Sequence, residues 1–437
     1  MTSAVQSVSA RNRAGADGAM ALPPVVLLGG EANALSAARS LGRRGIRVYA
    51  ISEPGGCIRH SRYCRPVILP DEGPFEETCA KFLLGRESDY LSGAVLLAFS
   101  DAAIQALCQN RDQLLKKYKL DESAPAAQMA MLNKVSTYQA ARAAGVPTPA
   151  FWVVQSRSQV ISLRNELVFP LIVKPVLAHK AKKSFGQKHE RVANFDELLR
   201  VLDAEHAAGL DVLLMELIPG GDDCLCSYYT YLDESCAALF DFTKRIIRRF
   251  PVGMGPACYH ITDWVPDIIE HGRRLFRHVG LRGLANVEFK KDPRDGQYKL
   301  IECNARFTAA NCLVAASGFD LSEFVYNRIV GLPQTPLVNF KRGLRLWDPA
   351  LDVMSFLALR RRGELTAGRW IAGLLHRQTF AYFAWTDPLP ALARGRKLLK
   401  LSIKRWRQMA AGGAVPRVAA SESQTSRSAQ PTEPRPV

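Results

Sequence analysis

The segment NVEFKKDPRDGQYKLIECNARF, residues 286–307, contains two runs rich in apolar residues on either side of DPRDG, residues 292–296. Proline presets φ and glycine readily takes positive φ, so these five residues predict a tight turn. The two runs therefore predict the strands of an antiparallel β-hairpin.

Polar side chains alternate with apolar ones along the second run, so the hairpin should have one polar face and one face directed into a core. The polar face carries Glu302, Asn304 and Arg306. Glu288, on the first run, lies between two apolar residues and should point the same way. Two carboxylates, an amide oxygen and a guanidinium are thus expected to converge.

Oxygen donors of this kind suit magnesium, which usually keeps coordination positions for water and substrate phosphates. We therefore interpret Glu288, Glu302 and Asn304 as metal ligands. Arg306 would supply a planar cation for phosphate oxygens during phosphoryl transfer. The alternative is an ordinary hairpin with a solvent-facing side, although such a side would more commonly mix its charges.

Two lysines precede this hairpin at the ends of predicted elements. Lys134 begins an amphipathic helix, and Lys174 ends the apolar strand FPLIVK, residues 169–174. A single lysine in such a place is usually just solvent-exposed. Their order before a carboxylate hairpin makes both candidates for a functional role.

The run VLLMELIPGGDD, residues 212–223, is typical of a strand that enters a glycine turn. An adenine ring needs an apolar slot and a backbone donor and acceptor at its edge, which such a strand end can supply. The candidates for the adenine edge and the ribose hydroxyls are Glu216, the backbone of Leu217 and Ile218, and Asp223. Taken alone, Glu216 could equally be a charged residue at a strand edge.

Strands and helices alternate before about residue 150, which predicts a parallel α/β sheet, whereas later strands follow one another in an α+β pattern. Beyond about residue 334 the chain is helical, aromatic and basic, and its end has a composition typical of disorder. We expect a disordered leader 1–22, a Rossmann-like domain 23–130, a nucleotide- and metal-binding domain 131–332, a basic helical appendage 333–408 and a disordered tail 409–437.

The net charge is +17, and much of the excess lies between Lys341 and Arg407, where 15 Lys or Arg accompany four acidic residues. No zinc-finger, RNP-like or helix-turn-helix pattern occurs with it, so we expect no specific nucleic-acid partner. Ten cysteines lack the CxxC spacing of a structural zinc site, which favours reduced thiols. Without a signal peptide or an apolar stretch of about 18 residues, the sequence predicts a cytoplasmic protein.

Leu392, Leu399, Ile403 and Trp406 recur at helical spacing among seven basic residues, which predicts an amphipathic basic helix. Its apolar stripe could pack on the rest of the protein. Alternatively, residues 391–408 could make weak peripheral contact with an anionic membrane. Both interpretations stay open at this point, as does assembly into a homo-oligomer.

Five short motifs, taken in order, resemble the ATP-grasp superfamily, and within it carboxylate–amine ligases similar to carbamoyl-phosphate synthase large-chain ATP-binding domains and D-aspartate ligases. The motifs are LNK (132–134), FPLIVK (169–174), ELIPGG (216–221), VEF (287–289) and IECNAR (301–306). The resemblance runs from Pro24 to Leu332. It implies an ATP-grasp fold with an N-terminal Rossmann-like pre-ATP-grasp domain and a helical C-terminal appendage.

The resemblance also implies an activity. Such ligases use ATP and Mg²⁺, with Mn²⁺ as an alternative ion, to convert a small-molecule carboxylate into an acyl phosphate and couple it to an amine. It implies phosphate contacts from Lys134 and Lys174, and it gives Arg306 the task of steadying the transferring phosphate or acyl phosphate. The resemblance also implies nucleotide contacts from Glu216, Leu217, Ile218 and Asp223. It implies metal ligands at Glu288, Glu302 and Asn304.

This sequence departs from the family at two places. Residues 176–188, where the family usually has a glycine-rich flap over the phosphates, contain one glycine and several lysines. Asn133 stands where an acidic residue often precedes the lysine, and we assign it no role.

Two other functions are compatible with parts of the sequence. Gly29 and Gly30 follow a predicted strand and Glu53 follows the next, as in dinucleotide-dependent oxidoreductases, but the spaced second and third glycines are missing. A noncatalytic scaffold with the same fold is the other alternative. ATP hydrolysis with candidate substrates would separate it from a ligase.

Overall fold

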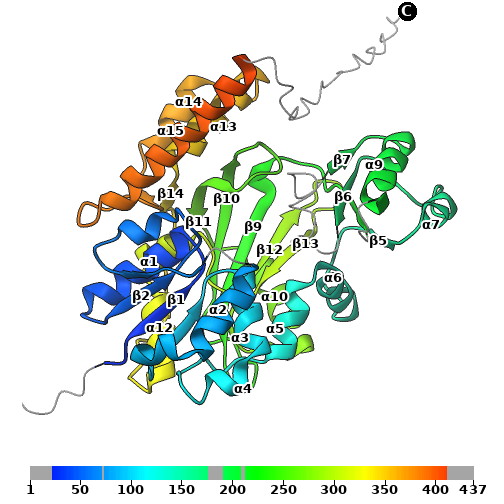
Figure 1. Cartoon of the computed structure of the whole chain (residues 1–437). Coiled ribbons are helices and arrows are strands. Elements are labelled where there is room, and N and C mark those ends of the chain that lie inside the picture. The colour runs from blue at the N-terminus through cyan, green and yellow to red at the C-terminus, as the bar shows by residue number, and fades with distance from the viewer. Residues whose placement is uncertain (1–21, 71–72, 176–189, 208–211, 411–437) are drawn as a thin grey trace, which may run out of the picture. The chain divides into compact units, whose positions relative to one another are not determined.

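The computed structural model describes residues 22–70, 73–175, 190–207 and 212–410. Within these residues the strands form three sheets (Figure 1). The chain divides into two units, with the boundary between Pro390 and Ala391. The predicted mixture of α/β and α+β architecture is confirmed.

The first sheet has the strand order β3-β2-β1-β4 and is parallel throughout. Its strands are β1 (Val25–Leu28), β2 (Val48–Ile51), β3 (Arg65–Val67) and β4 (Val95–Ala98), and its main helices are α1 (Ala32–Arg43), α2 (Phe75–Leu84) and α3 (Asp101–Gln109). All four residues of β1 are buried, because helices cover the sheet on both faces. Ser100 caps α3, its Oγ accepting a hydrogen bond from Ala103 N at 3.2 Å.

The second sheet is small and antiparallel, with the order β5-β8-β6-β7. Its strands are β5 (Phe151–Val154), β6 (Leu171–Pro175), β7 (Glu190–Val192) and β8 (Val212–Glu216). Helices α7 (Arg157–Ser162) and α9 (Phe195–Ala207) share a core with it, while α5 (Pro125–Leu132) and α6 (Lys134–Ala143) precede it. The Lys-rich segment 176–188 lies outside the described residues.

The third sheet has seven strands in the order β13-β12-β9-β10-β11-β14-β15. They are β9 (Leu225–Leu232), β10 (Phe242–Arg249), β11 (Ala257–Thr262), β12 (Gly283–Lys291), β13 (Tyr298–Asn304), β14 (Arg345–Trp347) and β15 (Gln378–Phe380). Helix α10 (Pro266–Val279) packs closely on one face of this sheet. The close approach is possible because residue 272 is glycine, since a Cβ there would lie 2.3 Å from the Tyr228 ring. Helices α11 (Asn311–Ala316) and α12 (Leu321–Val330) follow the hairpin.

The region after residue 333 is not purely helical, so that part of the expectation is wrong. β14 and β15 extend the large sheet, with β14 antiparallel to β11. Helices α13 (Pro349–Arg361) and α14 (Ala367–Leu374) accompany them. Strands of three residues are too short to show the alternation by which a strand is recognised in sequence.

A buried aspartate fixes this C-terminal region to the sheet. Asp352 on α13 is fully buried and accepts two hydrogen bonds from Arg248, from Nε at 2.6 Å and from Nη2 at 3.0 Å. The indoles of Trp347 and Trp370 donate to Asp352 Oδ2 at 3.0 and 2.9 Å. One carboxylate therefore joins β10, α13, β14 and α14.

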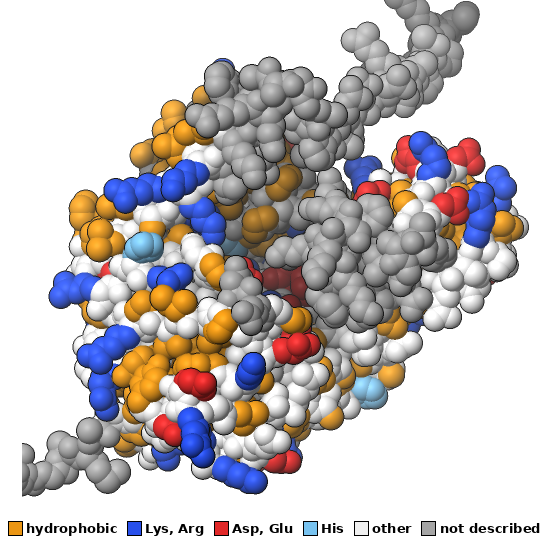
Figure 2. All heavy atoms as spheres, in the orientation of Figure 1, with side chains coloured by type: hydrophobic (Ala, Val, Ile, Leu, Met, Phe, Trp, Pro, Cys, Tyr) orange, Lys and Arg blue, Asp and Glu red, His pale blue; other side chains and the backbone are white. Residues whose placement is uncertain are grey.

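The predicted basic helix near the C-terminus is present as α15 (Leu389–Ala410). Among the described residues, no helix combines the length and apolar composition that crossing a bilayer requires. All ten cysteines are free, in keeping with the expected thiols. Lys and Arg side chains are spread over the face shown in Figure 2.

Candidate active site

The predicted hairpin is formed by β12 and β13, and its two glutamates face each other. Glu288 pairs directly with Glu302, and Asn286 with Asn304. A bulge at Ile301 follows this pair, which lets Leu300 return to the core. The structure thus places Glu288, Glu302 and Asn304 on one surface, as the alternation predicts.

The strand ends earlier than expected, which changes the position of Arg306. β13 stops at Asn304, so Arg306 lies in the following segment and not on the strand face. Phe307 leaves the hairpin to stack on Phe99 at 4.6 Å between ring centroids. Asn33 Nδ2 holds this turn by donating to Phe99 O at 2.8 Å and to Phe307 O at 2.9 Å.

A row of polar residues crosses four neighbouring strands of the large sheet. Lys244 pairs with Ser227, Ser227 with Glu288, and Glu288 with Glu302. Lys244 is 2% exposed, and its Nζ donates to Ser227 Oγ at 2.9 Å. The sequence analysis missed Lys244. The available signal was its place between Phe242 and Ile246, because these three alternate residues share a face.

The charges in this row influence one another. Desolvation raises the pKa of Glu288, and the carboxylate of Glu302 raises it further, whereas Lys244 acts in the opposite sense. Burial also disfavours the charged form of Lys244 and lowers its pKa, while the nearby Glu288 carboxylate raises that pKa. Two adjacent carboxylates in a partly desolvated place repel each other, and a divalent cation between them would remove that repulsion.

The donor set fits a magnesium-type ion better than a closed metal site. In the described part of the chain, no group of three or more His, Cys, Asp or Glu side chains could hold a metal. Magnesium commonly takes one or two carboxylates and fills its other positions with water and substrate phosphates. Glu288 and Glu302, with the amide oxygen of Asn304, satisfy that requirement. In Figure 2, acidic side chains lie within the central hollow of the face shown.

The two predicted lysines lie near this pair of carboxylates. Lys134 begins α6, and Asn133 caps that helix, its Oδ1 accepting from Ser136 N at 3.1 Å. Lys174 on β6 has a pKa lowered to about 8, mainly by burial and next by Lys134, while Glu302 opposes the shift. Two lysines that lie near each other form a site suited to an anion.

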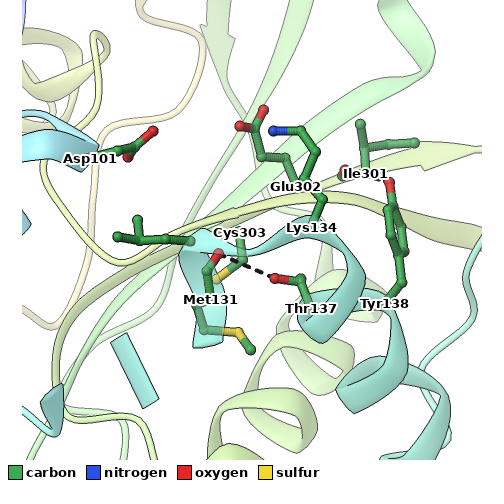
Figure 3. A pocket seen from close by; sticks show the side chains of 9 residues that line it. Asp101, Met131, Lys134, Thr137, Tyr138, Ile301, Glu302 and Cys303 are labelled. Atoms are coloured by element: carbon green, nitrogen blue, oxygen red, sulfur yellow. Dashed lines mark hydrogen bonds between the residues drawn. The ribbon is translucent and has the colours of Figure 1, made fainter. Parts of the chain in front are cut away.

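Figure 3 shows a small pocket that Lys134 and Glu302 line together. Tyr138 closes one side, its OH donating to Ile301 O at 2.7 Å. Asp101, from the start of α3, lines the same pocket, although sequence analysis did not single it out. Its Oδ1 lies 2.5 Å from Arg306 Nε in an ion pair.

The predicted nucleotide edge is held by the hairpin itself. Lys290 on β12 donates from Nζ to Ile218 O at 2.9 Å and to Gly220 O at 2.8 Å. Arg294 in the hairpin turn forms an ion pair with the Glu216 carboxylate, which also accepts from Ala150 N. The Glu216 carboxylate is therefore already engaged by Arg294 and Ala150 in this structure.

The other candidates at this edge differ in their surroundings. Leu217 N donates to Pro170 O at 3.3 Å, so this amide is already used within the small sheet. Asp223 is exposed in a short 3₁₀ helix, Asp222–Cys224. Its neighbour Asp222 binds Arg249 Nε at 2.9 Å, and Arg249 acts electrostatically on Lys174 and Glu288. Arg249 is thus a second basic residue that sequence reasoning missed.

The glycines that suggested a dinucleotide site have a structural explanation. Gly29 and Gly30 take φ values of +70° and +78°. A Cβ at Gly29 would lie 2.3 Å from Ser100 Oγ, and one at Gly30 would lie 2.5 Å from Phe99 Cβ. Close packing against the loop after β4 therefore requires glycine at both positions.

Comparison with known proteins finds similarity to the proteins that the sequence motifs resemble. Residues 258–330 match the family model of the carbamoyl-phosphate synthase L chain, ATP binding domain. A D-aspartate ligase of Enterococcus faecium (strain Aus0004) is 26% identical over 344 residues, which cover 74% of this chain and 81% of that protein.

Solved structures agree at the level of the fold. An L-amino acid ligase from Bacillus licheniformis has a TM-score of 0.53 at 16% identity, over 70% of this chain and 74% of its own. The biotin carboxylase domain of the Hydrogenobacter thermophilus 2-oxoglutarate carboxylase, solved with MgADP, has a TM-score of 0.55 at 16% identity, over 75% of this chain and 74% of its own. The chain is therefore similar in sequence to a D-aspartate ligase and to part of the carbamoyl-phosphate synthase family, and its fold is similar to that of an L-amino acid ligase and a biotin carboxylase domain.

Proposed function

We propose that this protein is a ligase that uses ATP to convert a small-molecule carboxylate into an acyl phosphate and then joins it to an amine. The observation that carries the proposal is the direct pairing of Glu288 with Glu302, close to Lys134 and Lys174. The relatedness to a D-aspartate ligase supports the same class of reaction. Consumption of ATP favours the cytoplasm as its location.

Each residue then has a defined task. Lys134 and Lys174 bind phosphate oxygens, while Glu288, Glu302 and Asn304 hold the divalent ion. When bound, Mg²⁺, or Mn²⁺ in its place, neutralises charge on the phosphoryl group in transfer. Arg306 binds the acyl phosphate, and Lys244 helps to keep Glu288 ionised. The five donors of a guanidinium suit Arg306 to a tetrahedral phosphate.

The adenine edge is assigned to the backbone around Ile218, with Asp223 as the ribose contact. Lys290 fixes the position of this loop by holding Ile218 O and Gly220 O. Glu216 contributes through its backbone, because Arg294 occupies its carboxylate. Leu217 contributes to the adenine edge through its side chain or its carbonyl, because its backbone N–H already donates to Pro170 O.

A substrate panel tests the proposal directly. Individual amino acids and other carboxylates would be supplied with ATP, Mg²⁺ and hydroxylamine, and both ADP release and hydroxamate formation would be measured. A ligase gives both products with at least one carboxylate. ATP binding without either product across the panel would instead support the noncatalytic scaffold.

The lowered pKa of Lys174 gives a pH dependence of nucleotide binding. Below about pH 8 the side chain is an ammonium that attracts phosphate; above it the free protein must take up a proton to bind. The dissociation constant of a nonhydrolysable ATP analogue should therefore rise through pH 8, approaching tenfold per pH unit. Lys174→Met should bind more weakly at pH 7 and lose this dependence, while exposed Lys291→Met should match the wild type. An unchanged pH profile in Lys174→Met would exclude Lys174 as the phosphate contact.

For α15 we propose weak, reversible contact of residues 391–408 with anionic membrane surfaces. Its basic residues each contribute about 1 kcal/mol near such a surface. Sedimentation with phosphatidylserine-containing vesicles should show binding that decreases with salt, and neutral vesicles should not bind. If removal of residues 391–437 leaves the sedimentation unchanged, the helix has no such role.

A further inference from the structure

The first sheet places the ends of two strands beside the carboxylate hairpin. In the order β3-β2-β1-β4, β2 and β3 lie on one side of β1 and β4 on the other. Open parallel sheets bind ligands at such a reversal, beyond the carboxyl ends of the strands. Here those ends carry Gly29 after β1 and Ser100-Asp101 after β4.

The hairpin reaches this point through Arg306 and Phe307. Phe307 stacks on Phe99, and Arg306 pairs with Asp101 at 2.5 Å. The Asp101 side chain is nevertheless 59% exposed, and Arg306 contacts its Oδ1. A carboxylate is thus held in a fixed direction while solvent can still reach it.

Asp101 also lines the pocket that contains Glu302 and Lys134. Figure 3 shows the carboxyl groups of Asp101 and Glu302 on the same side of the pocket, with the amino group of Lys134 next to Glu302. Of the two acids that line this pocket, Glu302 comes from the hairpin and Asp101 from the start of α3, which follows β4 of the first sheet.

The proposed reaction leaves one task without a residue. An alkyl amine is largely protonated at neutral pH, and an ammonium cannot attack an acyl phosphate. Lys134, Lys174 and Arg306 would repel an ammonium, and Glu302 is committed to the divalent ion. Asp101 is the remaining charged residue that lines the pocket. Its negative charge would attract an ammonium group.

We propose that Asp101 binds the ammonium group of the amine substrate and accepts its proton, an inference that rests on the proposed ligase function. The amine nitrogen forms the C–N bond with the acyl carbon, the bond from that carbon to the phosphate oxygen breaks, and inorganic phosphate leaves. The ammonium gives one proton to Asp101, which passes it to solvent, and the second proton that the nitrogen loses as the C–N bond forms goes to the departing phosphate. The pocket lined by Asp101, Lys134 and Glu302 accordingly receives the ammonium end of the amine substrate.

Hydroxylamine makes the test specific, because it is mostly neutral at pH 7 and needs no base. Asp101→Asn keeps an oxygen that can accept from Arg306 but removes the charge. With the carboxylate found in the panel, this variant should form hydroxamate within about twofold of the wild-type rate. With an amino acid as the amine, its kcat/KM should fall by about 100-fold or more. Its remaining ligation should increase about tenfold per pH unit as free amine accumulates.

Asp112→Asn, an exposed aspartate on the short helix Arg111–Leu114, serves as the matched control and should behave like the wild type. Asp101→Glu should recover part of the ligation. An equal loss of hydroxamate and ligation in Asp101→Asn would show that Asp101 only positions Arg306, which overturns the proposal. Absence of both products from the wild-type protein would instead overturn the ligase function itself.

Discussion

Replacing Glu302 by glutamine should lower ATP turnover by about 10²–10³-fold, because the proposed metal site loses one of its two carboxylates. The fold should survive. Glu302 lies opposite Glu288, and removal of one of two repelling carboxylates should leave the free energy of unfolding of the metal-free protein unchanged or higher. ADP release at limiting Mg²⁺ and urea denaturation measure the two effects.

Glu270→Gln provides the matched control for this variant. Glu270 is exposed on α10 and pairs with Arg274 one turn away, so its replacement should change neither turnover nor stability appreciably. Near-normal turnover by Glu302→Gln at limiting Mg²⁺ would refute the metal assignment. A large loss of stability would show that Glu302 has a structural role.

Replacing Arg248 by methionine should reduce the free energy of unfolding by about 3–5 kcal/mol, because the fully buried Asp352 would lose its cation. Urea denaturation measures the change. Arg245→Met, three residues earlier on the same strand, breaks a pair with Asp263 that is open to solvent and should cost at most about 1 kcal/mol. Similar losses in both variants would mean that Asp352 is not held by Arg248.

A second replacement separates lost charge pairing from lost packing. In Arg248→Met combined with Asp352→Asn, this pair leaves no buried charge, while an amide oxygen can still accept from Trp347 and Trp370. The double variant should therefore be more stable than Arg248→Met alone. If it is less stable, packing around Arg248 dominates.

Local patterns in the sequence predicted the hairpin well, because its turn and its alternation are properties of consecutive residues. The same is true of the α6 helix that starts at Lys134. Lys244 was missed because its electrostatic interaction with Glu288 depends on β9 lying between β10 and β12, an order that no local period in the sequence records. Asp101 was missed for a similar reason, since 205 residues separate it from Arg306.

Glu216 illustrates a different limit. Its position at the end of a strand was predicted, but the use of its carboxylate depends on Arg294, which lies 78 residues later in a turn. A sequence can therefore indicate where an acidic group stands without showing whether a distant cation already engages it. The position of Arg306 beyond β13 likewise follows from the stacking of Phe307 on Phe99, a contact between separate sheets.

The addition of β14 to the large sheet bears on how much of the chain is needed for a well-behaved protein. A chain cut after Leu332 would retain every proposed ATP and metal residue but would lose β14, and β11 would become an open edge. Its unpaired backbone groups could then recruit strands from other molecules, a common route to aggregation. The segment after the proposed site residues thus protects the edge strand β11 of the part that precedes it.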